Sequence, residues 1–114
     1  MSPTTVCDPV SRRGADELFE LLGNELAREI LVRTSDDSRS ASELAGRCDV
    51  SKPTVYRRLE ELERHELVEK EARYDADGNH YAAYACRVEE MTFGVDGDGV
   101  TVELDRCSPV ADDG

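Results

Sequence analysis

Apolar residues recur along this chain with two different periods. Between Asp16 and about His65 they return every three or four positions, which is the period of a helix that buries one face. Between Leu67 and Leu104 they alternate with polar residues, which is the period of a strand with one buried face. The pattern predicts a helical N-terminal part followed by β-hairpins.

Capping residues predict where the first three helices begin and end. The first helix starts at Asp16 and stops at Gly23, and the second follows Asn24, whose side chain suits an N-cap. The third starts at Ser40, where the spacing to Glu43 makes a capping box. Such side chains satisfy backbone N–H groups that the first turn of a helix leaves unpaired.

A three-residue turn, "DVS", leads into a fourth helix, predicted at about 52–65. Ser51 suits its N-cap, and Pro53 falls in the first turn, where the missing N–H costs little. Its inner stripe consists of Val55, Leu59 and Leu62. On a helical wheel this stripe lies opposite Arg57, so Arg57 and its neighbours are expected to face outwards.

Two hairpins are predicted in the second part of the chain. The segments "LVEKEARY" and "HYAAYACR" flank the Gly-containing turn "DADGN". In the second hairpin, apolar residues alternate on both sides of "DGDG" and fall on one face: Met91, Phe93, Val95, Val100, Val102 and Leu104. Because an isolated hairpin is marginally stable, this face is expected to pack on the domain's own core or on a second subunit.

The charge balance changes how one segment is interpreted. The chain has 26 Asp and Glu against 14 Lys and Arg, a formal net charge of −12. This profile resembles that of haloarchaeal proteins, in which a carboxylate-rich surface stays hydrated at molar salt. The acidity is therefore explained by the solvent and says little about which partners the protein binds. Against it, the segment 52–58 carries three positive charges and no negative one. This island indicates a docking site for a polyanion.

The order helix, three-residue turn, helix and hairpin is that of a winged helix-turn-helix. The segment "ELAGRCDVSKPTVYRRLEELERHELV" (43–68) resembles the recognition segment of ArsR-type winged-helix transcription regulators, and "LLGNELAREIL" resembles the short helices before it. The resemblance covers about residues 16–86. It implies an α+β fold with three to four helices and a wing hairpin, and a regulator that binds double-stranded DNA with the helix at 52–65.

Four regions are therefore expected along the chain. They are a flexible N-terminal arm at 1–14, a winged helix-turn-helix domain at 15–88, a C-terminal β-hairpin at 89–106 that packs on the domain or on a second subunit, and a tail at 107–114. The sequence has no run of about 18 apolar residues and no apolar centre near its start, so we expect a cytoplasmic protein without a membrane span.

The basic island contains most of the residues expected to contact DNA. Lys52 and Arg57 suit phosphate or guanine, Thr54 and Tyr56 suit base edges or thymine methyl groups, and Ser51 suits backbone positioning.

Arg58 lies nearer the buried side of the helix and is either a phosphate clamp or a partner of Glu61 within the chain. An alternative for the whole island is a solvated helix face on which Arg57 pairs with Glu61.

The wing is predicted to contribute less to DNA binding. Arg73 and His80 could reach the DNA backbone or the minor groove, but Asp75 and Asp77 at the tip would repel phosphate.

The four cysteines are too far apart for a zinc site, and we expect no metal. Metal-sensing ArsR-type members place paired cysteines where this chain has Ser40 and Ser42. Cys48 falls where such sequences have an apolar core residue. Cys7, Cys86 and Cys107 could serve thiol sensing, a reading that depends on a lowered thiol pKa.

These observations favour a homodimeric DNA-binding transcription regulator without a cofactor. No catalytic motif is present, because the two histidines are isolated and no phosphate-binding glycine loop occurs. Two alternatives stay open at this point. One is a winged-helix module that binds a protein and not DNA, and the other is a regulator that senses redox state or a metalloid through its thiols.

Overall fold

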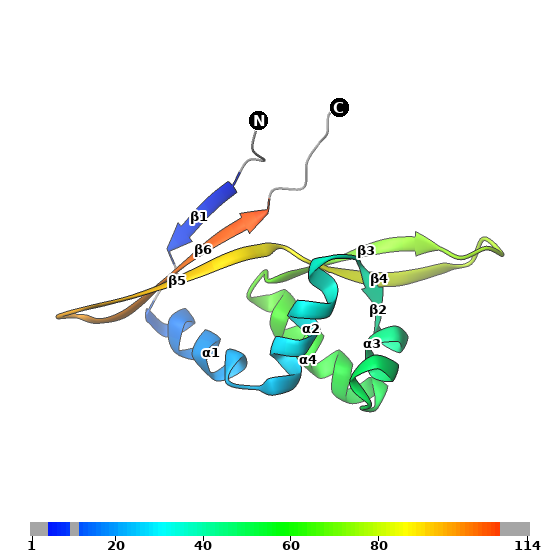
Figure 1. Cartoon of the computed structure of the whole chain (residues 1–114), viewed down its shortest axis with the longest axis horizontal. Helices are drawn as coiled ribbons and strands as arrows, with labels where there is room; N and C mark the ends of the chain where they lie inside the picture. The colour runs from blue at the N-terminus through cyan, green and yellow to red at the C-terminus, as the bar shows by residue number, and fades with distance from the viewer. Residues whose placement is uncertain (1–4, 10–11, 108–114) are drawn as a thin grey trace.

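The computed structural model describes residues 5–9 and 12–107, and the fold is α+β, as the sequence predicted. The helices are α1 (Arg12–Leu22), α2 (Glu25–Ser35), α3 (Ala41–Cys48) and α4 (Lys52–Arg64). The strands are β1 (Thr5–Pro9), β2 (Arg39–Ser40), β3 (Val68–Tyr74), β4 (His80–Cys86), β5 (Val88–Asp96) and β6 (Gly99–Cys107) (Figure 1). They form a winged helix-turn-helix with an additional C-terminal β-hairpin.

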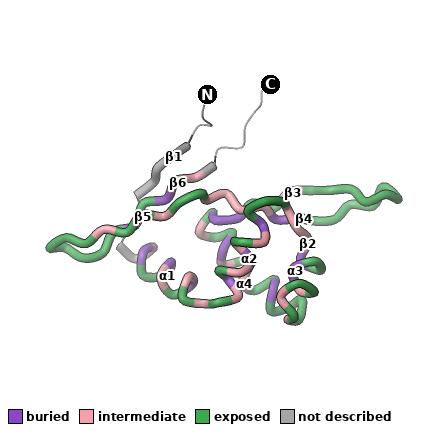
Figure 2. The backbone as a smooth tube through the Cα atoms, in the orientation of Figure 1, coloured by how far each residue is buried: buried purple, intermediate pink, exposed green. Residues whose placement is uncertain are grey.

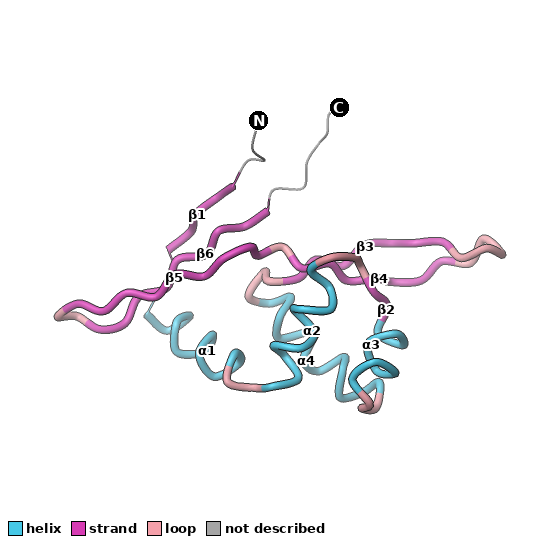
Figure 3. Tube along the Cα trace, viewed as in Figure 1, coloured by secondary structure: helices cyan, strands magenta, loops and turns pink. Residues whose placement is uncertain are grey.

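The strands form two antiparallel sheets of three strands each within the described residues. The first has the order β2-β4-β3 and contains the wing hairpin, and the second has the order β1-β6-β5 and contains the C-terminal hairpin. The two hairpins extend in opposite directions, and the helices lie on one side of them (Figures 1 and 3).

The predicted helix starts are confirmed. The Asn24 side chain accepts a hydrogen bond from the backbone N–H of Ala27, and Ser40 and Glu43 form the complete capping box at the start of α3. Ser51 accepts from the N–H of Thr54 at the start of α4. One start differs, because α1 begins at Arg12 and therefore earlier than predicted.

The expectation of a flexible arm does not hold for Thr5–Pro9, which forms β1. This strand pairs in antiparallel register with β6, so that Thr5 lies opposite Cys107 and Pro9 opposite Glu103. The pairing partner is almost the whole chain length away. Because the arm has no apolar period of its own, its sequence holds no signal for a strand that is stabilised by the open edge of β6.

The core joins all four helices to both sheets. The predicted stripe of α4 is buried, as are residues of the other helices and of both sheets: Val55, Leu59 and Leu62 with Leu18, Ile30, Leu44, Leu67, Tyr84, Val102 and Leu104. The base of the C-terminal hairpin thus belongs to the core of its own domain. Its outer part is exposed, as is most of the wing (Figure 2).

Candidate nucleic-acid interface

The first two turns of α4 present an exposed surface that carries positive charge. Ser51 caps the helix, and Pro53 lies in its first turn. Lys52, Tyr56 and Arg57 are exposed, while Val55 between them is fully buried. The burial of Val55 fixes the rotation of the helix, and this rotation turns its neighbours outwards.

Lys52 and Arg57 have no ion-pair partner within 4.0 Å among the described residues. Their charges are therefore available to a ligand. The Tyr56 side chain next to Arg57 is 49% exposed. An exposed aromatic ring between two unpaired cations offers both a stacking surface and charge, which suits nucleic acid.

Thr54 was expected to contact bases, but its hydroxyl group takes part in the cap of α4. Its hydroxyl oxygen lies 2.9 Å from the Ser51 hydroxyl, so the two side chains cap the helix together. The cap engages the hydroxyl of Thr54 and leaves its methyl group for apolar contact.

Arg58 is half-buried and forms an ion pair with Glu61. Arg58 was expected to be either a phosphate clamp or a partner of Glu61, and the structure contains the pair with Glu61. The pairing that the solvated-face alternative required, between Arg57 and Glu61, does not occur, because Glu61 is bound to Arg58. The Arg58 Nε is buried and has no hydrogen-bond partner among the described residues.

The second half of α4 has the opposite charge. Glu60 and Glu63 are exposed there, beyond the last residue of the basic island. Phosphate would be repelled from these turns. A polyanion that docks on α4 is therefore restricted to its N-terminal half, where the helix N-terminus also favours negative charge.

The two faces of the wing differ in their relation to α4. Lys70 lies opposite Tyr84 in the β3–β4 register, so both residues are on one face. Burial raises the pKa of the Tyr84 hydroxyl, with smaller contributions from Tyr56, Glu63 and Glu60 of α4. The face that carries Lys70 is thus the one that turns toward α4.

Arg73 lies on the other face of the wing. It donates a hydrogen bond to the Ser38 hydroxyl and lies 3.7 Å from a carboxylate oxygen of Glu71. Arg73 is therefore not brought together with the basic island. His80 is exposed on the same face as Lys70, and its ring packs against Tyr74 with 4.4 Å between ring centroids.

Lys70 is the residue that sequence reasoning missed. The available signal was the strand period, since Lys70 is two positions from the buried Val68 and so shares its face.

The tip of the wing is a tight turn organised by a carboxylate. Asp75 accepts hydrogen bonds of 2.9 Å from the backbone N–H groups of Asp77 and Asn79. The backbone hydrogen bond from Asn79 is the largest cause that lowers the pKa of Asp75. The tip is therefore negatively charged at neutral pH, which disfavours its contact with phosphate.

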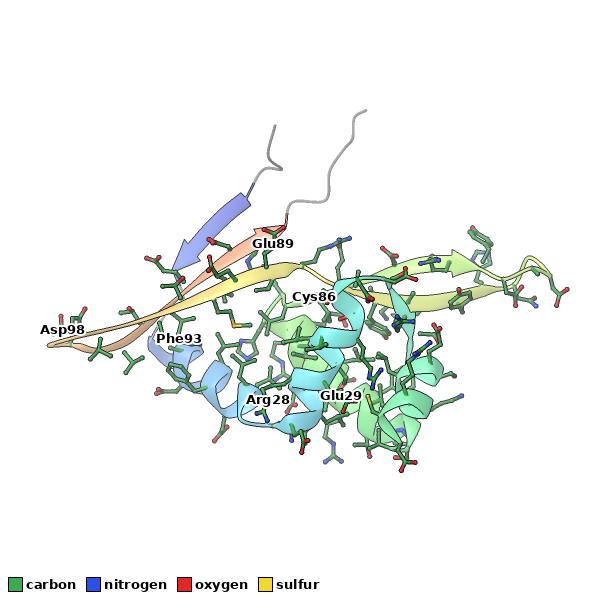
Figure 4. The ribbon with its side chains drawn as sticks, in the orientation of Figure 1. Arg28, Glu29, Cys86, Glu89, Phe93 and Asp98 are labelled. Atoms are coloured by element: carbon green, nitrogen blue, oxygen red, sulfur yellow. The ribbon has the colours of Figure 1, made fainter. Side chains whose placement is uncertain are left out.

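The described thiols do not have the lowered pKa that sensing would require. Burial raises the pKa of Cys86, whose Sγ donates to the Val88 carbonyl oxygen. The neighbouring Arg87 forms ion pairs with Glu69 and Glu71 (Figure 4 labels Cys86). Within the described residues, no group of three His, Cys, Asp or Glu side chains could hold a metal ion.

The other three cysteines give no further support to thiol sensing. Burial also raises the pKa of Cys48, which is half-buried and not a fully buried core residue. Cys7 and Cys107 lie in β1 and β6, where the register pairs them with Asp105 and Thr5 and not with each other. Their side chains lie outside the described part of the chain.

The C-terminal hairpin is bonded to the end of α4. Arg106 of β6 donates hydrogen bonds to the backbone carbonyls of Glu66 and His65, and it lies 3.7 Å from the Glu66 carboxylate. Glu66 has the left-handed φ of 61° that ends the helix. A cation at this position satisfies carbonyl groups that the last turn leaves unpaired.

Comparison with known proteins agrees with this geometry. Residues 22–71, from the last residue of α1 into β3, match the model of the helix-turn-helix domain family. No curated protein matches the chain. Among the described residues, no helix is long and apolar enough to cross a membrane. The match includes the two helices and the turn that carry the basic island, and it supports a DNA-binding regulator in general.

Proposed function

We propose that the protein is a sequence-specific, ArsR-like transcription regulator that places the N-terminal half of α4 in the major groove of DNA. One observation carries this proposal: Lys52, Tyr56 and Arg57 are exposed, without acidic partners among the described residues, on a chain whose formal net charge is −12. Because the net charge of the chain is negative, an uncompensated basic surface at this position of a helix-turn-helix supports a polyanionic ligand.

The contacts follow from the geometry of α4. Arg57 projects from the centre of the exposed face and reads guanine or clamps phosphate, while Tyr56 and the Thr54 methyl group meet base edges. Ser51, Lys52 and the helix N-terminus bind phosphate. In the wing, Lys70 and His80 share the face that turns toward α4, so they contact the backbone in preference to Arg73.

The regulator acts as a cytoplasmic homodimer that reads two half-sites about one helical turn apart. The outer part of the C-terminal hairpin supports self-association. There Phe93, Val95 and Val100 are 49%, 83% and 44% exposed. These apolar side chains lie on the same face of the hairpin as the buried Val102 and Leu104, but no part of the described chain covers them fully.

The test is DNA binding by purified protein in KCl, with random genomic fragments and sequencing of the fragments that are retained. Arg57→Ala is expected to weaken binding to the enriched site by about 1 to 3 kcal/mol if Arg57 binds a base, or to lower the salt slope by about one if it binds only phosphate. The matched control is Arg28→Ala, which changes an exposed arginine of α2. Equal, negligible retention of the unmodified protein and the variant would refute DNA binding.

A second candidate function is a winged-helix module that binds a protein. Glu60, Glu63 and the wing tip place acidic groups on the side proposed to face DNA, and the exposed apolar end of the hairpin would dock the partner. DNA binding that weakens as KCl rises separates the two functions. Thiol sensing receives no support from Cys86, and for Cys7 and Cys107 intact-mass analysis after mild oxidation tests it.

A further inference from the structure

A cavity of about 320 Å³ lies between α1 and the C-terminal half of α4, and Arg58, the last residue of the basic island, lines it. Its charged side chains have both signs and come from both helices: Glu17, Glu20, Arg58, Glu61, Arg64 and His65. Known small-molecule sites begin at about 300 Å³, so this cavity has the size for a ligand of few heavy atoms.

Several of these groups are not fully satisfied within the protein. The Arg58 Nε is a buried donor without a partner among the described residues. For Arg64 and Glu20, no ion-pair partner lies within 4.0 Å in the described part of the chain. His65 Nε2 and Glu17 Oε1 are 3.8 Å apart, which is too far for a hydrogen bond. Arg64 and Glu20 thus present charges of opposite sign from the two helices that line the cavity.

We propose that this cavity binds a small zwitterion that carries a carboxylate and a protonated amine, the chemistry of a free amino acid. The carboxylate binds the guanidinium groups of Arg58 and Arg64, and the ammonium group binds Glu17 and Glu20. A ligand with only negative charge would face three glutamates, and one with only positive charge would face two arginines. Only a molecule with both charges is complementary to both sides of the cavity.

The position of the cavity gives the ligand a route to DNA binding. Arg58 and Arg57 are consecutive residues of α4, one in the cavity and the other on the exposed basic surface. A ligand that bridges α1 and α4 stabilises one position of α4 relative to the rest of the domain. This coupling rests on the proposed DNA-binding function, whereas ligand binding itself does not. We expect the ligand to change DNA affinity by about fivefold or more.

Ligand binding is tested first without DNA. The full-length protein is titrated with L-lysine, L-glutamine and L-glutamate up to about 10 mM, a range that detects dissociation constants into the millimolar. Calorimetry measures affinity, and the Arg58 Nε–H resonance in a two-dimensional ¹H–¹⁵N NMR spectrum reports contact at the cavity. At least one amino acid is expected to bind and to shift this resonance. Acetate and methylammonium, which each carry one of the two charges, are expected to bind at least tenfold more weakly.

Two variants and two controls localise the site. Arg58→Gln and Glu20→Gln are each expected to weaken amino-acid binding tenfold or more. The matched controls Arg47→Gln and Glu25→Gln change exposed residues outside the cavity lining and are expected to bind as the unmodified protein does. Far-UV circular dichroism establishes that each variant is folded.

Three outcomes would overturn the proposal. They are the absence of binding by all three amino acids, equal binding by folded Arg58→Gln and the unmodified protein, and acetate binding as tight as that of the amino acid. If an amino acid binds at the cavity but the protein retains no DNA, the proposed function fails and the zwitterion site stands.

Discussion

The wing hairpin and the C-terminal hairpin are built alike, but one exposes a polar face and the other an apolar face. In each, two long antiparallel strands are joined by a turn that contains Asp and Gly, and the base of the hairpin is buried in the core. Beyond the base, the wing carries Lys70, Tyr74 and His80 on the face that turns toward α4. The C-terminal hairpin carries the exposed apolar side chains of Phe93, Val95 and Val100 beyond its buried residues.

Because one face is polar and the other apolar, the two hairpins suit different kinds of partner. The polar wing face turns toward α4 and suits a hydrated, charged ligand such as DNA. The face of the C-terminal hairpin is apolar from base to tip, with the Phe93 ring 5.3 Å from that of Phe19 and pointing toward α1 (Figure 4). Exposed apolar area of this kind is characteristic of a contact with another protein surface. The same strand period thus gives a polar surface in one hairpin and an apolar surface in the other, through the residues placed on one face.

The largest expected effect tests whether the base of the C-terminal hairpin is core. Leu104 is fully buried, so Leu104→Ala is expected to lower the free energy of unfolding by about 2 to 5 kcal/mol. Val95→Ala in the same hairpin shortens an exposed side chain and is expected to change the free energy of unfolding by about 0.5 kcal/mol or less. Urea denaturation measures both. Similar losses for the two variants would mean that the hairpin is uniformly packed.

The next effect concerns the apolar end of that hairpin. Val95 and Val100 lie opposite each other, so Val95→Lys with Val100→Glu replaces an apolar pair by an opposite-charge pair and leaves the net charge unchanged. We expect the dimer to dissociate at least tenfold more readily, as measured by sedimentation equilibrium, with an unchanged far-UV dichroism spectrum.

The control for this experiment is Thr92→Lys with Thr101→Glu, which places the same charges on the opposite face of the hairpin. A dimer that survives the Val95 and Val100 changes would exclude this face as the subunit contact.

A smaller effect distinguishes the two faces of the wing. Lys70→Ala removes a cation on the face toward α4 and is expected to lower the slope of log affinity for DNA against log salt by about one. Arg73→Ala removes a cation bound to Ser38 and Glu71 and is expected to leave the slope unchanged. Fluorescence anisotropy across KCl concentrations measures both slopes. The reverse result would mean that DNA meets the other face of the wing.

The smallest effect concerns the thiol at the base of the wing. Because burial raises the pKa of Cys86, less of it is thiolate at pH 8 than in a free cysteine, and its alkylation by iodoacetamide is expected to be slower. The folded state favours the neutral thiol, so the stability that this preference contributes is lost as pH rises through the raised pKa. Peptide mass spectrometry over time measures the rate. Alkylation as fast as that of free cysteine would mean that the Cys86 thiol is reactive enough to serve as a sensor.

Local features of the sequence were sufficient for much of the fold. The caps at Asn24, Ser40 and Ser51 act on N–H groups three residues away, so their signal lies within a single turn. The buried stripe of α4 and the alternation in both hairpins also follow from short-range periods. The exposed position of Arg57 was predictable because the stripe on the same helix determines it.

What the sequence by itself determined is therefore the helices, the hairpins and the outward face of α4. Tertiary structure alone decided that Thr5–Pro9 pairs with β6 and that Arg106 binds the end of α4. These features depend on strand register and on contacts between residues far apart in the chain. A local period carries no information about which distant edge or carbonyl group a segment will meet, because packing of the whole domain selects that partner.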